Sequence, residues 1–423
     1  MAVVKSKQQE VQKFQTIDGL HVTLIKKPGY HQLLGALSTK FGSLITAFRD
    51  GQNEEVVIPA GTAHFLEHKL FDKEAGDALL RFTELGADAN AFTGPNQTTY
   101  YFTATNQLAE NLTWLLTFVQ KPYFTEAKVS RERGIIEEEI KLYQDDPAWQ
   151  LYQGILGLLY PKSPLSLDIA GTAESLQAIS ADLLYQIHAV FYQPENLELT
   201  VVGDFDFEQV HQLVDQVQTE VALPKSAISL PNVTLLEQSN FDRKLPVKVS
   251  VPKAAYGLRL PTRPSTLTAT DRVSETLLGE LTLDLIFGDQ TTWFQEKYQE
   301  GIFGDDFDYE YTNLPDYHYL TFFVDGQHQA EAQKAIIDRL AEAQNVLKVA
   351  EAEFVRLKKA MAGQMLASQN SPERLGLDED LILYGLSLFD KISLTTRFNL
   401  EDVLASGKRL FEGGRLSRLI LEK

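Results

Sequence analysis

The stretch that decides the fold carries two histidines four residues apart, and it reads Gly61-Thr62-Ala63-His64-Phe65-Leu66-Glu67-His68-Lys69-Leu70-Phe71. If this stretch is helical, both imidazoles lie on one face about one turn apart, with Glu67 near that face. Two imidazoles placed in this way can bind one metal ion. The alternative is an amphipathic helix whose histidines only pack or face solvent. Histidine is scarce here, with 8 in 423 residues, and this favours a metal site.

Zinc is the metal that this pattern indicates. It binds imidazole nitrogen well, and a catalytic zinc needs three protein ligands and an open position for water. A carboxylate beside that water can accept its proton. The sequence therefore predicts a Zn²⁺ cofactor bound by His64 and His68, with Glu67 as the general base.

The composition is that of an ordinary soluble globular protein, with 44% hydrophobic and 23% charged residues. A net charge of -19 argues against a surface for nucleic acid or for an anionic membrane. The chain has no cysteine, so any metal must bind histidine, aspartate or glutamate. No run approaches the roughly 18 apolar residues of a membrane span, and no signal peptide is recognised. We therefore expect a cytoplasmic protein.

A chain of 423 residues exceeds what one hydrophobic core usually serves, so more than one domain is expected. Proline-containing sequence without helical periodicity marks the boundary. The predicted parts are an N-terminal zinc-binding domain at 1–222, a linker at 223–246 and a related C-terminal domain at 247–423. Both domains are predicted to be α+β, each with a mostly antiparallel sheet packed with helices.

Local patterns support this division. Alternating apolar and polar residues predict a strand at 20–24. Enrichment in threonine, tyrosine and phenylalanine predicts two strands at 89–105, joined by a turn at 94–96. A strand, a polar turn and an amphipathic helix recur along the chain, at 98–120, 197–220 and 318–346. A diverged internal duplication explains such a recurrence.

Two histidines leave the metal one ligand short. On a helix predicted at 125–145, Glu132 and Glu139 are seven residues apart and share one face. Glu139 is the stronger candidate for the third ligand, whereas Glu137 and Glu138 are expected on a solvated acidic face. The remaining histidines lie in no ligand-like spacing, and they are His21, His31, His188, His211, His318 and His328.

The chain resembles the zinc peptidases of the pitrilysin and insulinase family, the inverzincins, over nearly its full length. Beside the histidine motif, the segment that carries the resemblance is Glu132-Arg133-Gly134-Ile135-Ile136-Glu137-Glu138-Glu139-Ile140. The resemblance implies that Glu139 is the third zinc ligand. It also implies that Glu132 supports the site without binding the metal.

The segment Asn90-Ala91-Phe92-Thr93 resembles the edge strand of that family, to which a peptide substrate adds as an extra strand. Backbone pairing of this kind binds peptides with limited regard for their sequence. The implied function is that of a zinc-dependent metalloendopeptidase acting on peptides or small unfolded segments. The alternative is a non-catalytic subunit that binds peptides or assembles a processing complex. The intact zinc motif counts against that alternative.

The sequence departs from the family pattern in two ways. The interval from His68 to Asn90 is shorter than in the larger members, which points to the short bacterial branch. Active members also bind the substrate near the scissile carbonyl with an arginine and a tyrosine from the C-terminal half. The corresponding segment 306–329 has no arginine, and its tyrosines are expected to pack on a sheet: Tyr309, Tyr311, Tyr317 and Tyr319. We therefore expect a partner, either a related second chain or a second copy in a homodimer.

Overall fold

The computed structural model describes every residue except 1–9, 222–227, 262–266 and 412–413. Internal contacts divide the chain into two units. Unit 1 comprises residues 1–140, 168–232 and 369–385, and unit 2 comprises residues 141–167, 233–368 and 386–423. Each unit combines one main sheet, mostly antiparallel, with packed helices, so the predicted fold class is confirmed.

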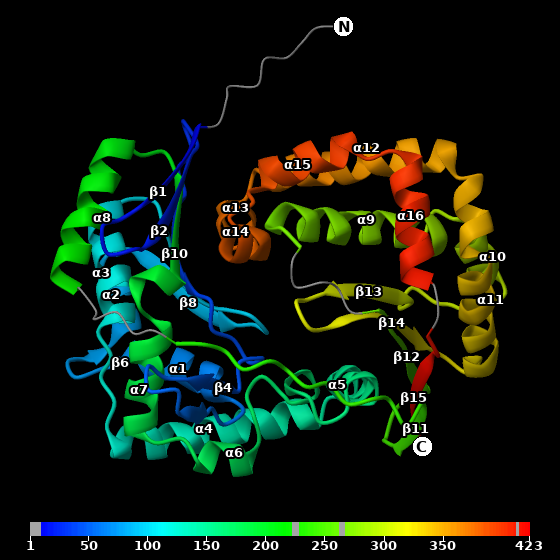
Figure 1. Ribbon diagram of the computed structural model, residues 1–423, viewed down its shortest axis with the longest axis horizontal. Coiled ribbons are helices and arrows are strands. Elements are labelled where there is room, and N and C mark those ends of the chain that lie inside the picture. Colours follow the sequence, from blue (N-terminus) through cyan, green and yellow to red (C-terminus); the bar gives the residue numbers. More distant parts are fainter. Residues whose placement is uncertain (1–9, 222–227, 262–266, 412–413) are drawn as a thin grey trace, which may run out of the picture. The chain divides into compact units, whose positions relative to one another are not determined.

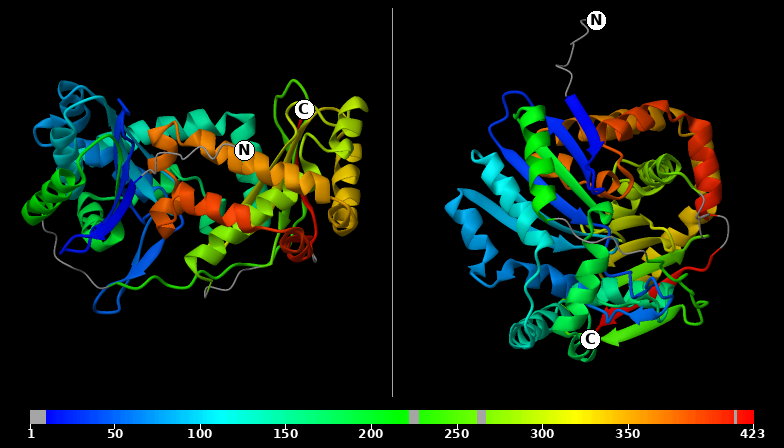
Figure 2. Two further views of the ribbon diagram at one scale, coloured as in Figure 1. Left: turned by 90° about the horizontal axis from the view of Figure 1, so that it is seen from above. Right: turned by 60° about the vertical axis from the view of Figure 1, so that its left-hand side comes forward.

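Unit 1 is built on a six-stranded sheet (Figures 1 and 2). Its strands, in spatial order, are β1 (Glu10–Gln15), β2 (His21–Lys26), β10 (Leu197–Gly203), β3 (Leu33–Thr39), β9 (Thr98–Ala104) and β8 (Ala87–Thr93). Strands β2 and β10 are parallel, and the other neighbouring pairs are antiparallel. Strand β8 forms one edge, because in the described part of the chain it pairs only with β9.

Different helices cover the two faces of this sheet. Val201 of β10 belongs to the apolar core that includes residues of α3 (Leu108–Gln120) and α8 (Phe207–Val221). Its neighbour Val202 points to the opposite face, as successive strand residues do. There it lies beside Gly376 of α13 (Pro372–Gly376). Figure 1 shows α8 and α13 on opposite sides of the strands.

Unit 1 has further elements around this sheet. Its other helices are α1 (Thr62–Phe71), α2 (Ala78–Glu84), α4 (Glu126–Gln144, of which residues to 140 belong to unit 1), α6 (Ala173–Gln177), α7 (Ala181–Phe191) and α14 (Glu379–Tyr384), with a 3₁₀ turn at Pro194–Asn196. Two small hairpins complete it, formed by β4 (Ala47–Arg49) with β5 (Glu55–Val57) and by β6 (Asp72–Lys73) with β7 (Gly76–Asp77).

Unit 2 contains a five-stranded sheet. Its strands, in spatial order, are β11 (Asp242–Pro246), β15 (Ser417–Glu422), β12 (Lys253–Arg259), β14 (His318–Asp325) and β13 (Asp308–Asn313). Strands β11 and β15 are parallel, and the other pairs are antiparallel. If five strands are numbered along the chain, from β2 in unit 1 and from β11 in unit 2, both sheets have the order one, five, two, four, three. This shared topology agrees with the prediction of two related domains.

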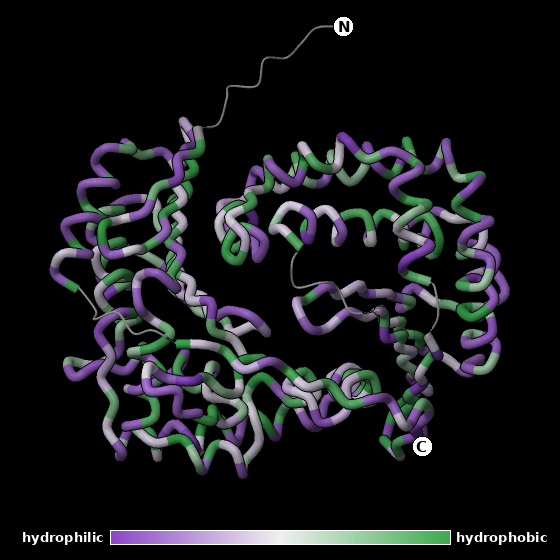
Figure 3. The backbone as a smooth tube through the Cα atoms, in the orientation of Figure 1, coloured by the Kyte–Doolittle hydropathy of each residue, from purple (hydrophilic) through white to green (hydrophobic). Residues whose placement is uncertain are grey.

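The helices of unit 2 cover this sheet and one another. They are α5 (Pro147–Leu159), α9 (Ala269–Phe287), α10 (Thr292–Gln299), α11 (Gln329–Lys348), α12 (Glu351–Ser368), α15 (Leu388–Arg397) and α16 (Leu400–Phe411), with a 3₁₀ turn at Pro164–Ser166. Hydrophobic and hydrophilic residues alternate along the outer helices, as Figure 3 shows for α8 and α11. This is the pattern expected where one helix face packs and the other meets water.

The two units differ in extent from the parts expected at 1–222, 223–246 and 247–423. Helix α5 belongs to unit 2, since Ile155 packs in a core cluster with Leu419 of β15. The segment 369–385 belongs to unit 1, where Gly376 lies against Leu34 of β3. Part of the expected linker, 242–246, forms strand β11. Helix α5 and the segment 369–385 are both short, and each belongs to its unit through contacts with residues distant in sequence.

None of the helices in the described part of the chain has both the length and the apolar character needed to cross a membrane.

Candidate metal centre

Helix α1 carries the histidine motif, and its start is fixed by a glycine. Gly61 has φ 88°, a left-handed conformation that favours glycine, and a Cβ there would lie 2.4 Å from the carbonyl oxygen of Ala170. One side of α1 packs into the core through Phe65, Leu66 and Leu70. The spacing of four residues then places His64 and His68 together on another side, as the sequence predicts.

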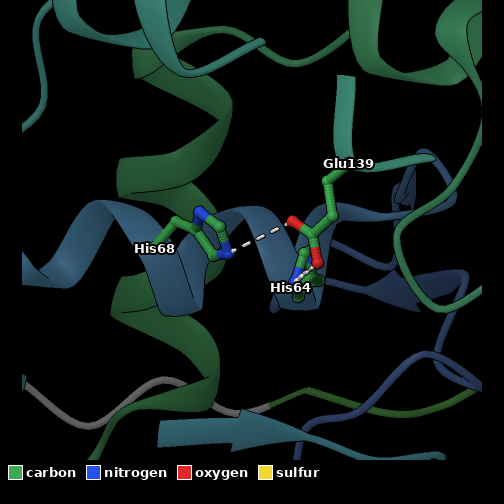
Figure 4. A group of neighbouring side chains, drawn as sticks. All are labelled: His64, His68 and Glu139. Atoms are coloured by element: carbon green, nitrogen blue, oxygen red, sulfur yellow. Dashed lines mark ion pairs between the residues drawn. The ribbon is translucent and has the colours of Figure 1, made fainter. Parts of the chain in front are cut away.

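The structure brings both histidines to one carboxylate (Figure 4). Nε2 of His64 lies 3.8 Å from Oε1 of Glu139, and Nε2 of His68 lies 3.8 Å from Oε2 of the same residue. Glu139 extends from α4 and points between the two imidazoles. In the described residues, these three form the single group of histidine and acidic side chains close enough together to bind a metal.

The donor set and its spacing fit zinc. Two imidazoles and one carboxylate are a ligand set that catalytic zinc uses, with a fourth position open to water. Ligands about 2.1 Å from a tetrahedral zinc lie about 3.4 Å from one another. The separations of 3.8 Å are close to this value. Small side-chain movements would therefore suffice for all three residues to bind one ion.

The two histidines differ in how they are held. Burial, with help from the neighbouring His68, lowers the pKa of His64 to about 4, so its imidazole is neutral at pH 7, as a metal ligand must be. Its Nδ1 atom is buried and has no hydrogen-bond partner among the described residues. His68, by contrast, has Oε1 of Glu132 at 3.1 Å from its Nδ1 atom.

Glu132 lies on α4 one heptad before Glu139, and its side chain is 10% exposed. Its second oxygen, Oε2, accepts a hydrogen bond from Nζ of Lys69 at 3.3 Å. Burial alone would raise the pKa of Glu132, but the hydrogen bond with His68 and the charge of Lys69 lower it. Glu132 is therefore an ionised carboxylate in contact with Nδ1 of His68, a geometry compatible with the supporting role that the family resemblance implies.

Glu67 lies beside the three candidate ligands without joining their group. The hydroxyl of Thr93 donates a hydrogen bond to Oε2 of Glu67 at 2.5 Å. Burial raises the pKa of Glu67, and the bond from Thr93 opposes this effect. A buried carboxylate with a raised pKa is suited to accept a proton and release it again.

The segment from Asn90 to Thr93 lies on β8, the edge strand. An edge strand leaves one row of backbone donors and acceptors free for another strand. Asn90 also lines a cavity of about 640 Å³ that reaches Glu67 and His68. The remaining lining residues are Phe71, Asp72, Gly76, Asp77, Leu79, Lys128, Arg131 and Glu132.

Other residues considered from the sequence have structural partners. In unit 2, the hydroxyl of Tyr309 donates to Asp284 at 2.7 Å, and that of Tyr311 lies 2.8 Å from Nε2 of His318. Tyr317 and Tyr319 are buried, so these tyrosines pack on the sheet as expected. In unit 1, His188 is buried and bonds the carbonyl of Val119.

Sequence reasoning missed four charged residues beside the metal group. Nζ of Lys69 lies 2.7 Å from Oδ2 of Asp72, and Asp72 also binds Lys128 and Arg131. One signal was available for Lys69: a lysine at a position that continues the apolar side of a short helix requires a buried partner.

Family models match most of the chain. Residues 46–173 match the model described as Insulinase (Peptidase family M16), and residues 178–361 match the model described as Peptidase M16 inactive domain. The first match contains every candidate site residue.

A curated relative and two solved structures extend this result. The chain is 33% identical to YmfH of Bacillus subtilis (strain 168), named an uncharacterized zinc protease, over 91% of this chain and 90% of the relative. An M16-like peptidase from Alicyclobacillus acidocaldarius has 26% identity and a TM-score of 0.92, covering 98% of this chain and 99% of its own. The periplasmic protease PqqL from Escherichia coli has 20% identity and a TM-score of 0.69, covering 98% of this chain but 48% of its own. The chain therefore belongs to peptidase family M16.

Proposed function

We propose that this protein is a zinc-dependent metalloendopeptidase that hydrolyses peptides or small unfolded segments. The observation that carries the proposal is the convergence of His64, His68 and Glu139 on one point, with Glu67 beside them. A scaffold protein has no need of this combination. The names of relatives such as YmfH, which is named an uncharacterized zinc protease, support the same activity.

Each residue has one role in the proposed mechanism. His64, His68 and Glu139 hold the metal, and zinc, when bound, lowers the pKa of its water towards about 7 and polarises the scissile carbonyl. Glu67 accepts the proton of the attacking water and then passes it to the leaving amine. Thr93 keeps the Glu67 carboxylate in place through its hydrogen bond.

The edge strand β8 would position the substrate. A peptide that pairs with β8 at Asn90, Ala91, Phe92 and Thr93 lies next to the site, because the hydroxyl of Thr93 contacts Glu67. Main-chain hydrogen bonds supply the affinity in this mode of recognition. Side chains of the substrate can enter the cavity lined by Asn90 and His68.

We also propose that the enzyme works with a second chain, either a related one or another copy of itself. Within unit 2, Tyr309 and Tyr311 are hydrogen-bonded and the other two tyrosines of 306–329 are buried. The segment also has no arginine to bind the substrate carbonyl. PqqL supports the idea, since this chain corresponds to about half of the PqqL chain. A partner would supply the missing groups that hold the carbonyl for attack.

A peptide-library digest by the purified protein tests the proposed activity, with and without candidate partners. We expect cleavage that stops when a chelator removes the metal and returns when zinc is added. The Glu67→Gln variant is the matched control and should cleave nothing. Zinc binding without cleavage under every condition would instead favour a non-catalytic, peptide-binding subunit. A protein that is monomeric by light scattering and cleaves as fast alone as in any mixture would exclude the partner proposal.

A further inference from the structure

We propose that Lys69 is a positioning residue of the metal centre, acting on His68 through Glu132. The inference rests on the proposed function, because it assigns Lys69 a role in zinc binding. Lys69 follows His68 directly on α1, and its side chain is 0% exposed. No part of this lysine therefore reaches solvent.

The burial of Lys69 calls for a specific reason. Its neighbours on the same side of α1 include Phe65, Leu66 and Leu70, which are fully buried. A methionine has similar length and would extend this apolar packing, whereas an ammonium group in such a place is strongly unfavourable unless it is paired. Lys69 has two partners: Oδ2 of Asp72 at 2.7 Å and Oε2 of Glu132 at 3.3 Å.

The contact with Glu132 completes a chain of three groups. The carboxylate of Glu132 receives His68 on one oxygen, at 3.1 Å, and Lys69 on the other. Both donors come from α1 and the carboxylate comes from α4, so the two bonds fix the carboxylate plane between the helices. An ionised carboxylate only accepts hydrogen bonds, so a neutral His68 imidazole carries its proton on Nδ1 and its lone pair on Nε2. Nε2 is the atom that faces Glu139 at 3.8 Å.

Asp72 does not depend on Lys69 in the same way. Lys128 and Arg131 also bind Asp72, the latter at 3.1 Å, so its charge stays compensated when Lys69 is changed. Among the described residues, the ion pairs of Glu132 are with His68 and Lys69 alone. Loss of the Lys69 ammonium group therefore affects Glu132 first, and through it the orientation of His68.

Zinc affinity is the direct test, measured by competition with a chelator on variants whose fold is checked by circular dichroism. Lys69→Met should bind zinc roughly 10- to 100-fold more weakly, as is typical when a partner of a metal-ligating histidine is lost. Lys128→Met is the matched control: it removes an equal charge from Asp72 without touching Glu132, and should leave zinc affinity unchanged. Lys69→Gln retains a hydrogen-bond donor and should fall between wild type and Lys69→Met. It decides the question if Lys69→Met does not fold.

A double-mutant cycle separates positioning from general destabilisation. If Lys69 acts through Glu132, the double variant Lys69→Met/Glu132→Gln binds zinc no more weakly than Glu132→Gln alone. The visible spectrum of bound Co²⁺ should also change in Lys69→Met but not in Lys128→Met. Additive losses, or equal losses in the Lys69 and Lys128 variants, would overturn the inference. A wild-type protein that binds no zinc contradicts the proposed function itself, whereas unchanged affinity in both Lys69 variants contradicts this inference alone.

Discussion

The two units share one sheet topology, but only unit 1 carries the candidate metal group in the described part of the chain. In each unit the first helix after the second of the five numbered strands contacts the edge strand: α1 contacts β8 in unit 1, and α9 contacts β13 in unit 2. The end of the edge strand bonds this helix in both. Thr93 donates to Glu67 of α1, and Asn313 donates to Thr276 of α9.

If these two hydrogen bonds are treated as equivalent, the residues of α1 can be aligned with those of α9. Glu67 then corresponds to Thr276, and the two histidines correspond to Val273 and Leu277, which are buried in unit 2. The same backbone place therefore holds either a group of ligands or apolar core. The shared strand order therefore places a helix beside the edge strand in both units, and a few side chains on that helix decide whether it can bind a metal.

The largest expected effect concerns Glu67, the residue of unit 1 that corresponds to Thr276 of unit 2. Glu67→Gln should slow peptide cleavage by about 10²–10⁴, because the attacking water loses its base, and should still bind zinc. Thr276→Val, at the corresponding place in unit 2, should leave the cleavage rate unchanged. Rates and zinc content of both variants check this. Loss of zinc from Glu67→Gln would mean that Glu67 is a ligand and not the base.

The next effect concerns the helix that supplies the carboxylate. Glu139→Gln should weaken zinc binding by more than about 100-fold, since loss of a ligand costs more than loss of its supporting partner. Glu138→Gln, one residue earlier on α4, should bind zinc as the wild type does. Calorimetric titration with zinc compares the two. Equal affinities would leave the third ligand unidentified.

A smaller effect concerns the sheets themselves. Burial raises the pKa of Glu198 on β10 to about 7, although Thr23 donates a hydrogen bond to it at 2.9 Å. Between about pH 4.5 and 7 the folded state thus holds more protons than the unfolded state, so stability falls as pH rises. Glu198→Gln should remove this fall and gain about 2–3 kcal/mol above pH 7.

The matched control for Glu198 lies on the corresponding strand of unit 2. Glu422 of β15 is 40% exposed and pairs with the exposed Lys244, and such surface pairs contribute little, so Glu422→Gln should change stability by less than about 1 kcal/mol. Denaturant unfolding of metal-free protein from pH 5 to 8 compares the three proteins. Parallel stability curves for wild type and Glu198→Gln would contradict the effect of burial.

The smallest effect concerns the hydrogen bonds that Thr93 and Asn313 make at the ends of the two edge strands. Thr93→Val keeps the shape of the side chain but removes its hydrogen bond to Glu67, and cleavage should slow by about tenfold, the cost of one bond to a charged group. Asn313→Ala removes the corresponding bond in unit 2 and should not slow cleavage. Steady-state kinetics on one peptide measures both. Equal losses would show that these bonds serve stability and not the base.

Local patterns were enough to predict most of the fold. The hairpin expected at 89–105 is present as β8 and β9, and the helix expected at 125–145 is α4. The extents of the two units were harder to predict, because α5 and the segment 369–385 belong to their units through contacts distant in sequence. No local periodicity shows which sheet such a segment will cover.

The candidate site, like the fold, could be predicted from the sequence only in part. The spacing of His64 and His68, and the heptad from Glu132 to Glu139, follow from helix geometry, so the sequence was sufficient for their grouping on two faces. It could not show that α1 and α4 meet, nor that Lys69 lies between Glu132 and Asp72. The contact of Lys69 with Glu132 arises from packing between helices separated by more than fifty residues, although the pair of Lys69 with Asp72 is local.

Anomalous X-ray scattering at the zinc absorption edge, from crystals of protein purified without chelators, tests the central claim most directly. The account predicts one strong peak in unit 1, about 2.0–2.2 Å from Nε2 of His64, Nε2 of His68 and a carboxylate oxygen of Glu139. It predicts no peak beside α9 of unit 2, where Val273, Thr276 and Leu277 occupy the corresponding positions. A peak elsewhere, or none at these three residues after zinc is added, would contradict it.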